Sequence, residues 1–240
     1  MEKIMQNIVI GIEGLVGAGK TSICREMLNY LPNAVLLNGG NLYRAIVYAI
    51  MQNGKNIEDL KKTNKDLDIK EMMDLFNINL KIEDNETIIY IGNKKIDEEL
   101  LQSKDVSLAV STVGGKADNK QLFAFARKLI DDLKKDYNVI ISGRSIMKIY
   151  PDTDYHFFVV ADLDERVKRK CAQYHNEESE EEIRKNIEMR DKLQEEAGFY
   201  ELSNSTITID VTNCKSIEQS TRLLLANIDM SDLKVPEEMC

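Results

Sequence analysis

Short apolar runs recur along the chain and are separated by longer stretches in which apolar residues return at helical spacing. The first run is Ile-Val-Ile-Gly-Ile at residues 8 to 12, and its β-branched residues favour a buried strand over a helix. Similar runs predict further strands at Ala34 to Leu37, Tyr137 to Ile141, His156 to Ala161 and Thr206 to Val211. Five such strands that alternate with helices predict an α/β fold.

Helices are predicted wherever the apolar residues line one face of a 3.6-residue period. They cover Thr21 to Leu31, Leu42 to Met51, Asp118 to Lys135, Asp164 to Tyr174, Ile183 to Glu196 and Ser216 to Ile228. Residues 77 to 96 have a different texture, with three short alternating segments divided by polar turns. This pattern predicts a small antiparallel meander, inserted into the α/β domain and able to close over an acceptor.

The segment directly after the first strand carries the clearest chemical signal. It reads Gly14-Leu-Val-Gly-Ala-Gly-Lys-Thr21, a strand, glycine loop, Gly-Lys-Thr and helix series typical of a P-loop. Glycines allow the sharp turn that directs backbone N–H groups at an anion. Lys20 is expected at the β- and γ-phosphates, and the Thr21 hydroxyl at Mg²⁺. The predicted ATP-binding residues are Gly14, Leu15, Val16, Gly17, Ala18, Gly19, Lys20, Thr21 and Ser22.

Composition narrows the possible partners. The net charge is −9, which argues against nucleic-acid binding because that function needs a basic surface. The four cysteines are widely separated and there are only two histidines, so we expect free thiols in a reducing compartment and no zinc site. No apolar run approaches membrane-spanning length and no signal peptide is evident, so we expect a cytoplasmic protein without a membrane partner. The oligomeric state is not indicated.

Several arginines are candidates for phosphate recognition. Arg44 and Arg144 follow the second and third predicted strands, and ligands of open α/β sheets collect at such strand ends. A guanidinium can hold two phosphate oxygens at once. Arg166 and Arg169 lie on a basic helix, and Arg190 lies on the helix after an acidic loop. This layout is typical of a kinase lid, although a charged, solvated helical hairpin has the same pattern.

The order of these motifs resembles that of the bacterial cytidylate kinase family, within the nucleoside monophosphate kinases, over residues 6 to 228. The pieces that carry the resemblance are spread over the chain. They are Gly14 to Thr21, Gly40 to Arg44, the meander ending in Ile91 to Ile96, Val106-Ser107 with Val110 to Val113, Gly143-Arg144, the strand at 156 to 161 with Asp164 to Arg169, and Met189-Arg190-Asp191.

The resemblance implies a P-loop kinase fold, with a parallel five-stranded sheet flanked by helices, a small three-stranded antiparallel insert and a helical lid. It also implies transfer of the γ-phosphoryl group of ATP to CMP or dCMP with Mg²⁺. It implies acceptor or phosphate contacts for Gly39, Tyr43, Arg44, Arg144, Arg190 and Asp191, and lid positions for Arg166 and Arg169. Lys20, Arg144, Arg166, Arg169 and Arg190 are the implied catalytic residues.

Parts of the acceptor site differ from the family pattern. Gly39 replaces a Ser or Thr, and Ser142 and Ser145 replace acidic residues around Gly143-Arg144. Residues 192 to 197, Lys-Leu-Gln-Glu-Glu-Ala, replace a run of Arg and Asp. The chain therefore resembles a divergent member with an altered acceptor site.

Two other functions stay open. A kinase of the same fold could act on a different nucleotide or on a small hydroxyl-bearing acceptor, which needs a general base. Glu13 is the nearest carboxylate for that role, and support of the P-loop is its alternative role. The chain could also be a catalytically weak nucleotide-binding regulator.

The domain organisation follows from the same pattern. We predict a single P-loop kinase domain over residues 1–228, with a core at 1–53 and 103–228. Residues 77–102 would form the acceptor-side insert and 166–190 the helical lid, and 229–240 would be a C-terminal tail.

Overall fold

The computed structural model describes residues 7–52, 71, 73–74, 76–103, 105–106, 120–173, 179–200 and 202–232. Its contacts divide the chain into two compact units. Unit 1 comprises Met1–Leu36 and Lys134–Cys240, and unit 2 comprises Leu37–Leu133. Unit 1 therefore holds both ends of the chain, and unit 2 is one continuous segment. The predicted boundaries of the insert at 77–102 and of the lid at 166–190 stay predictions.

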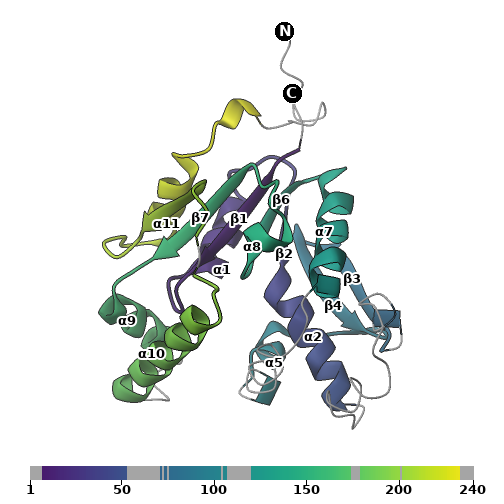
Figure 1. Cartoon of the computed structure of the whole chain (residues 1–240), viewed down its shortest axis with the longest axis horizontal. Coiled ribbons are helices and arrows are strands. Elements are labelled where there is room, and N and C mark those ends of the chain that lie inside the picture. The colour runs from purple at the N-terminus through teal and green to yellow at the C-terminus, as the bar shows by residue number, and fades with distance from the viewer. Residues whose placement is uncertain are drawn as a thin grey trace. The chain divides into compact units, whose positions relative to one another are not determined.

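A mostly parallel sheet forms the centre of unit 1 (Figure 1). Its strands follow the order β2-β6-β1-β7-β8. β1 pairs in parallel with both β6 and β7, and β7 pairs in parallel with β8. The bounds are β1 Val9–Gly14, β2 Ala34–Asn38, β6 Asn138–Ser142, β7 Tyr155–Val160 and β8 Thr206–Asp210. The five strands expected from the apolar runs are confirmed, with small shifts of their ends.

The helices α1, α9, α10 and α11 of unit 1 agree with the periodicity apart from their ends, whereas the short α8 and η1 were not predicted. The bounds are α1 Lys20–Met27, α8 Ile146–Ile149, α9 Leu163–Gln173, α10 Glu180–Glu196, α11 Ile217–Leu225 and the 3₁₀ helix η1 Met230–Asp232. α10 begins before the predicted Ile183 because Ser179 and Glu182 form a capping box, each side chain bonding the other's backbone N–H. Residues 233–240 of the predicted tail lie outside the described part of the chain.

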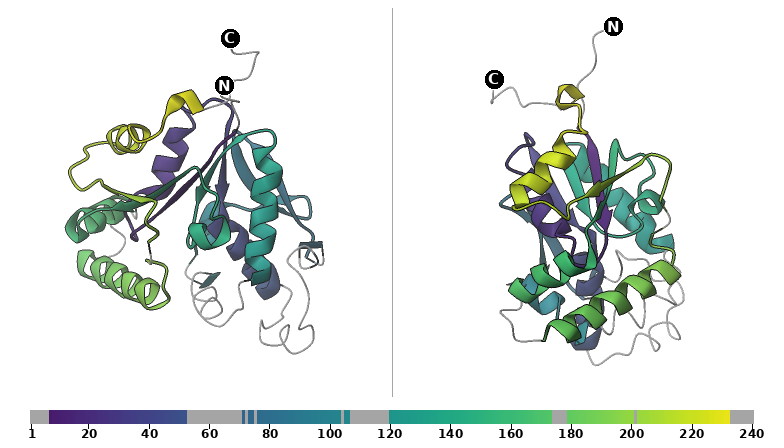
Figure 2. Two further views of the ribbon diagram at one scale, coloured as in Figure 1. Left: turned by 45° about the horizontal axis from the view of Figure 1, so that its top comes forward. Right: turned by 90° about the vertical axis from the view of Figure 1, so that its left-hand side faces the viewer.

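The alternation of side chains along β1 determines what each face of the sheet contacts. Ile8, Ile10 and Ile12 belong to the buried apolar cluster that includes residues of α1 and α11, two helices that pack side by side (Figure 2). Gly11 faces the opposite side, where an added Cβ would lie 2.8 Å from the Cγ2 atom of Ile146 in α8. Glu13, two residues further, shares that second face and is buried there.

Unit 2 contains the predicted meander. β3 pairs antiparallel with β4, and β4 with β5. The bounds in this unit are α2 Gly39–Gln52, β3 Ile78–Glu83, β4 Glu86–Ile91, β5 Lys94–Lys95, α5 Glu98–Leu101 and α7 Lys120–Lys134. The start of the helix predicted from Asp118 lies outside the described residues.

The core of unit 2 joins its long helix to the meander. Leu42 and Ile46 of α2 belong to one buried cluster with Ile78 and Ile89 of the strands. α2 begins earlier than predicted, because the Asn38 side-chain oxygen accepts a hydrogen bond from the backbone N–H of Asn41 at 3.3 Å and caps the first turn. Among the described residues, no helix is long and apolar enough to cross a membrane.

Candidate active site

The loop between β1 and α1 has the backbone geometry that a P-loop needs. Gly14 has a φ of 148°, and a Cβ there would lie 2.1 Å from the carbonyl oxygen of Val159 in β7. Gly19 has a φ of 92°, a left-handed conformation that L side chains rarely adopt, and it is the N-cap of α1. The first backbone N–H groups of α1, at Lys20, Thr21 and Ser22, have no partners within the helix, and N–H groups in this position are suited to binding an anion.

Lys20 lies folded against this loop. Its Nζ atom donates hydrogen bonds to the carbonyl oxygens of Gly14 at 3.0 Å and Leu15 at 2.6 Å. Burial lowers the pKa of Lys20 well below its usual value, and the positive charges of Arg144 and Arg190 lower it further. The two neighbouring guanidinium groups and the loss of water destabilise the Lys20 ammonium group. An anion bound here would therefore be stabilised by these positive charges.

Arg144 comes from the turn after β6. Because Ile12 of β1 pairs with Ser142 of β6, the turn and the P-loop leave the sheet at the same edge. Ser145, directly after Arg144, has a φ of 54° and is the N-cap of α8. Burial lowers the pKa of the Arg144 guanidinium, and the charge of Arg190 lowers it too, while the nearby Tyr200, Glu13 and Asp191 raise it.

Glu13 supports the turn from inside the protein. Its Oε1 atom accepts a hydrogen bond from the backbone N–H of Ile146, the first residue of α8. The Nε2 atom of His156 lies 3.3 Å from the same oxygen, and Nδ1 of His156 lies 2.9 Å from the Thr206 hydroxyl. Both ring nitrogens of His156 thus lie beside buried structural partners.

The predicted lid arginines lie against the P-loop. Arg166 is buried and donates to the carbonyl oxygen of Val16 at 3.1 Å. A Cβ at Gly17 would lie 3.3 Å from the Arg166 Cβ, so α9 and the loop approach closely. Arg169 donates to the Ala18 carbonyl at 3.4 Å and to the Val211 carbonyl at 2.8 Å.

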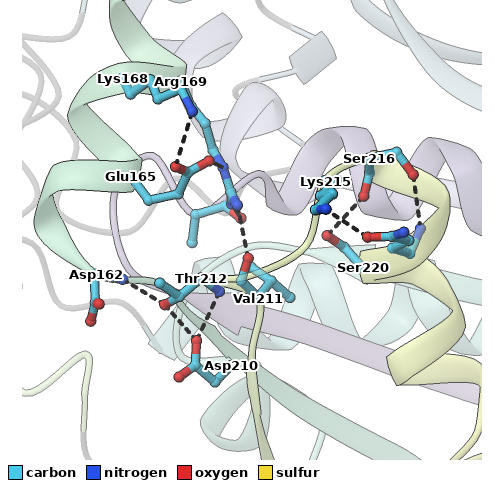
Figure 3. Close-up of polar contacts among 12 residues, drawn as sticks. Asp162, Glu165, Lys168, Arg169, Asp210, Val211, Thr212, Lys215, Ser216 and Ser220 are labelled. Atoms are coloured by element: carbon cyan, nitrogen blue, oxygen red, sulfur yellow. Dashed lines mark hydrogen bonds and ion pairs between the residues drawn. The ribbon is translucent and has the colours of Figure 1, made fainter.

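Figure 3 shows how Arg169 is held at the end of β8. Its Nε atom donates a hydrogen bond to the Glu165 carboxylate at 3.0 Å, and its Nη2 atom donates one to the carbonyl oxygen of Val211. The neighbouring Thr212 is held in turn, because its backbone N–H donates to Asp210 at 2.8 Å. The side chain of Arg169 is thus oriented by three groups from α9, the P-loop and the segment after β8.

Asp191 in α10 also contacts the P-loop. Its Oδ1 atom accepts a hydrogen bond from the backbone N–H of Val16 at 3.1 Å, and its Oδ2 atom accepts one from Arg166. Arg190, its neighbour, is half-buried and is among the charges acting on Lys20. The predicted acceptor contact of Asp191 stays a prediction, and its observed partners are in α9 and the P-loop.

Two functional candidates could not be found from the sequence. Gln194 accepts a hydrogen bond from the Nε atom of Arg144 at 2.8 Å, and the Tyr200 hydroxyl lies 2.8 Å from Asp191 Oδ1. Gln194 belongs to the run that departs from the family pattern, and Tyr200 lies beyond the end of α10. Neither carries a motif signal.

The remaining predicted acceptor residues belong to unit 2. Gly39 is the first residue of α2, and Tyr43 and Arg44 follow in its first two turns. Burial raises the pKa of Tyr43, and its hydroxyl has no hydrogen-bond partner among the described residues. Close by, Asn41 donates through Nδ2 to Glu98 at 3.2 Å. The acceptor roles of these residues stay predictions.

The donor set at the P-loop fits a hydrated metal ion shared with a phosphate. Thr21 lies half-buried in the first turn of α1, and a single hydroxyl suits Mg²⁺, which keeps several waters and takes its other ligands from phosphate oxygens. Within the described part of the chain no three His, Cys, Asp or Glu residues gather as a metal site. Cys24, Cys171 and Cys214 are free thiols, and Cys240 lies outside the described residues.

Known proteins resemble this chain over almost its whole length. A family model for cytidylate kinase matches residues 10–229. A cytidylate kinase of Clostridioides difficile (strain 630) is 31% identical over 238 residues, which cover 94% of this chain and 100% of that protein. A cytidylate kinase of Halalkalibacterium halodurans is 24% identical over 229 residues, which cover 93% of this chain and 98% of that protein.

Solved structures are more distant. An uncharacterized protein from Eubacterium ventriosum has a TM-score of 0.46 at 17% identity, covering 93% of this chain and 99% of that chain. A shikimate kinase from Bacteroides thetaiotaomicron has a TM-score of 0.41 at 14% identity, covering 92% and 99%. The family assignment therefore rests on the sequence matches. The chain belongs to the cytidylate kinase family and is a nucleoside monophosphate kinase-like phosphotransferase.

Proposed function

We propose that this protein transfers the γ-phosphoryl group of ATP to a nucleoside monophosphate, with CMP or dCMP as the acceptor. The observation that carries the proposal is the buried Lys20 beside Arg144 and Arg190: burial lowers the pKa of Lys20, and repulsion by the two guanidinium groups lowers it further. Partly desolvated cations beside one loop are costly without an anion, and a polyphosphate supplies that anion. Membership of the cytidylate kinase family supports the choice of acceptor.

The P-loop would bind the ATP phosphates. Lys20 would exchange its two carbonyl partners, Gly14 and Leu15, for phosphate oxygens. The backbone N–H of Val16 is held by Asp191, so the phosphates would use the later N–H groups of the loop and of the first turn of α1. Arg166 and Arg169 would keep the loop in this shape through its carbonyl groups at Val16 and Ala18.

The Thr21 hydroxyl would hold Mg²⁺ together with the phosphates. When bound, the ion neutralises part of the charge on the transferring group.

Arg144 and Arg190 would neutralise charge on the acceptor phosphate and on the transferring phosphoryl group. Both lower the pKa of Lys20, and Arg190 also lowers the pKa of Arg144, so the three cations lie near one another in unit 1. The acceptor contacts proposed for Gly39, Tyr43, Arg44 and Asp191 follow from the family resemblance. Transfer between phosphates depends mainly on alignment and charge neutralisation, which cationic side chains provide.

We favour a phosphate acceptor over a hydroxyl-bearing one that would use Glu13 as its base. Such an acceptor needs a general base, and Glu13 is the carboxylate nearest to the P-loop in sequence. The side chain of Glu13 is 4% exposed and its Oε1 atom is engaged by Ile146 and His156. Moving it to a substrate would leave the Ile146 N–H buried without an acceptor, which is costly.

An acceptor panel tests the proposal. Purified protein is supplied with ATP and Mg²⁺ plus CMP, dCMP, UMP, AMP, GMP or a nucleoside, and release of ADP is recorded. We expect release that depends on CMP or dCMP. Release only with another nucleotide would move the function to that acceptor, and ATP binding without acceptor-dependent release would identify a regulator and overturn the proposal.

A further inference from the structure

The chain reverses direction after α10 and brings Tyr200 back onto that helix. Gly198 has a φ of 72°, which makes the reversal possible, and the backbone N–H of Phe199 donates to the Gln194 carbonyl at 2.9 Å. The Tyr200 ring then meets Phe158 of β7 edge to face, with ring centroids 5.5 Å apart. The ring is therefore positioned by packing, independently of its hydroxyl group.

The Tyr200 hydroxyl lies between two acceptors on α10. It is 2.8 Å from Asp191 Oδ1 and 3.0 Å from Gln194 Oε1. Gln194 Oε1 also accepts the hydrogen bond from Arg144 Nε at 2.8 Å. Arg144 can only donate, which requires the amide oxygen rather than the amide nitrogen of Gln194 to face it. The hydroxyl has one proton to share between the two acceptors.

These contacts continue to the P-loop. Asp191 Oδ1 accepts the backbone N–H of Val16 at 3.1 Å, and Arg166 bridges Asp191 to the carbonyl oxygen of Val16. A continuous polar chain therefore runs from Arg144 through Gln194, Tyr200 and Asp191 to the loop.

The Arg144 guanidinium needs such a support. Arg190 and Lys20 are positive charges near it, and repulsion favours its displacement into solvent. Two contacts oppose that displacement: Nη1 donates to the Gly143 carbonyl at 3.1 Å within its own turn, and Nε donates to Gln194. Only the second contact comes from another element, α10.

We propose that Tyr200 and Gln194 are positioning residues for Arg144, which hold its guanidinium toward the P-loop ahead of the acceptor phosphate. This inference rests on the proposed function, because it takes Arg144 as a ligand of the acceptor phosphate. Neither residue needs to touch a substrate. The Tyr200 hydroxyl orients the Gln194 amide, and the amide orients Arg144. Loss of either link therefore affects acceptor use more than ATP binding.

The Tyr200→Phe variant tests the first link because it keeps the ring on Phe158 and removes only the hydroxyl group. We expect kcat/KM for the acceptor to fall about 3- to 10-fold, as for one lost hydrogen bond, with the ATP Kd changed less than about 2-fold. Tyr30→Phe is the matched control, because Tyr30 is 37% exposed and takes no part in the site. An equal loss for acceptor and ATP, or no loss, would overturn the proposal.

Gln194 variants test the second link. Gln194→Leu removes the acceptor for Arg144, whereas Gln194→Glu keeps one and adds an opposite charge. We expect the leucine variant to lose acceptor kcat/KM and the glutamate variant to retain most of it. In a double-mutant cycle, Tyr200→Phe should have almost no further effect on the Arg144→Lys background. Additive losses in that cycle would mean that Tyr200 acts only on the fold.

The proposed function and the positioning role of Tyr200 are contradicted by different results. Wild-type protein that transfers phosphate to no acceptor would contradict the proposed function and this inference together. Wild-type turnover with a fully active Tyr200→Phe variant would contradict the positioning role alone.

Discussion

Asp191 in α10 accepts a hydrogen bond from the backbone N–H of Val16 in the P-loop at 3.1 Å. The same carboxylate accepts a hydrogen bond from Arg166 in α9, which itself holds the Val16 carbonyl. One acidic side chain therefore joins α9 and α10 to the P-loop.

Removal of the Asp191 carboxylate should destabilise unit 1. The Arg166 side chain is 8% exposed, so Asp191→Ala leaves a buried cation without its partner, at a cost of about 3–5 kcal/mol. Asp191→Asn should cost less, because its amide oxygen still accepts the Val16 N–H. Urea unfolding measures the unfolding free energy of both variants.

Asp164→Ala is the matched control for Asp191→Ala. Asp164 pairs with Arg184 at 2.7 Å, again between α9 and α10, but its side chain is 87% exposed. Surface ion pairs contribute little to stability, so this variant should unfold at the same urea concentration as the wild type. Equal losses in the two alanine variants would contradict the anchoring role of Asp191.

ATP binding should be accompanied by proton uptake. In the protein without ATP, the pKa of Lys20 is lowered by burial and by the charges of Arg144 and Arg190. A growing fraction of Lys20 is therefore neutral as the pH rises through that lowered pKa. Bound phosphates favour the ammonium and raise the pKa again, so binding takes up protons in the window between the two values. Calorimetry at about pH 8 to 9.5, in buffers of different ionisation enthalpy, measures this uptake, since the ATP phosphates are then fully ionised.

The Lys20→Arg variant is the control for the proton measurement. A guanidinium keeps its proton throughout this pH range, so any ATP binding in the variant should proceed without uptake. A wild-type binding enthalpy that does not depend on the buffer would contradict the account of Lys20.

Glu13 should contribute to stability through its buried contact with the first turn of α8. Glu13→Ala leaves the buried N–H of Ile146 without its acceptor, at a cost of about 1–3 kcal/mol in unfolding free energy. Glu13→Gln keeps an oxygen in place and should lose less. Glu181→Ala, with a side chain 77% exposed, should leave the urea midpoint unchanged. A Glu13→Ala midpoint equal to that of this control would refute the role.

Cys24 should resist alkylation in the native protein. It is fully buried in α1, and burial raises the pKa of its thiol to about 12, so the reactive thiolate is almost absent at neutral pH. Cys171 and Cys214 are half-buried free thiols and should react first. Peptide mapping after iodoacetamide treatment, with and without urea, measures each site. Native labelling of Cys24 at the rate of Cys214 would contradict the assignment.

The P-loop and the strands were predictable because their signals are contiguous. A glycine loop between a strand and a helix specifies its own geometry, and the left-handed φ of 92° at Gly19 agrees with the choice of glycine there. Apolar runs likewise predict buried strands without any knowledge of their neighbours. Helix ends were less predictable, since the capping box at Ser179 lies outside the apolar pattern.

The supports of the site were not predictable, because each joins residues far apart in the chain. Asp191 and Val16 are separated by 175 residues, and Ile146 and Glu13 by 133. Gln194 appeared only as a departure from a family pattern, and its contact with Arg144 depends on how α10 lies against the turn after β6. Nothing local in the sequence encodes that packing.

The most direct test of the central claim is product detection with ATP labelled in the γ-phosphate, Mg²⁺ and CMP. We expect labelled CDP from the wild-type protein and from the surface control Lys185→Ala, whose side chain is 71% exposed. The Lys20→Ala variant should fold normally and lose at least about a hundredfold in rate, because it lacks the cation at the transferring group. Labelled inorganic phosphate without any labelled nucleoside diphosphate, or undiminished CDP formation by Lys20→Ala, would contradict the account.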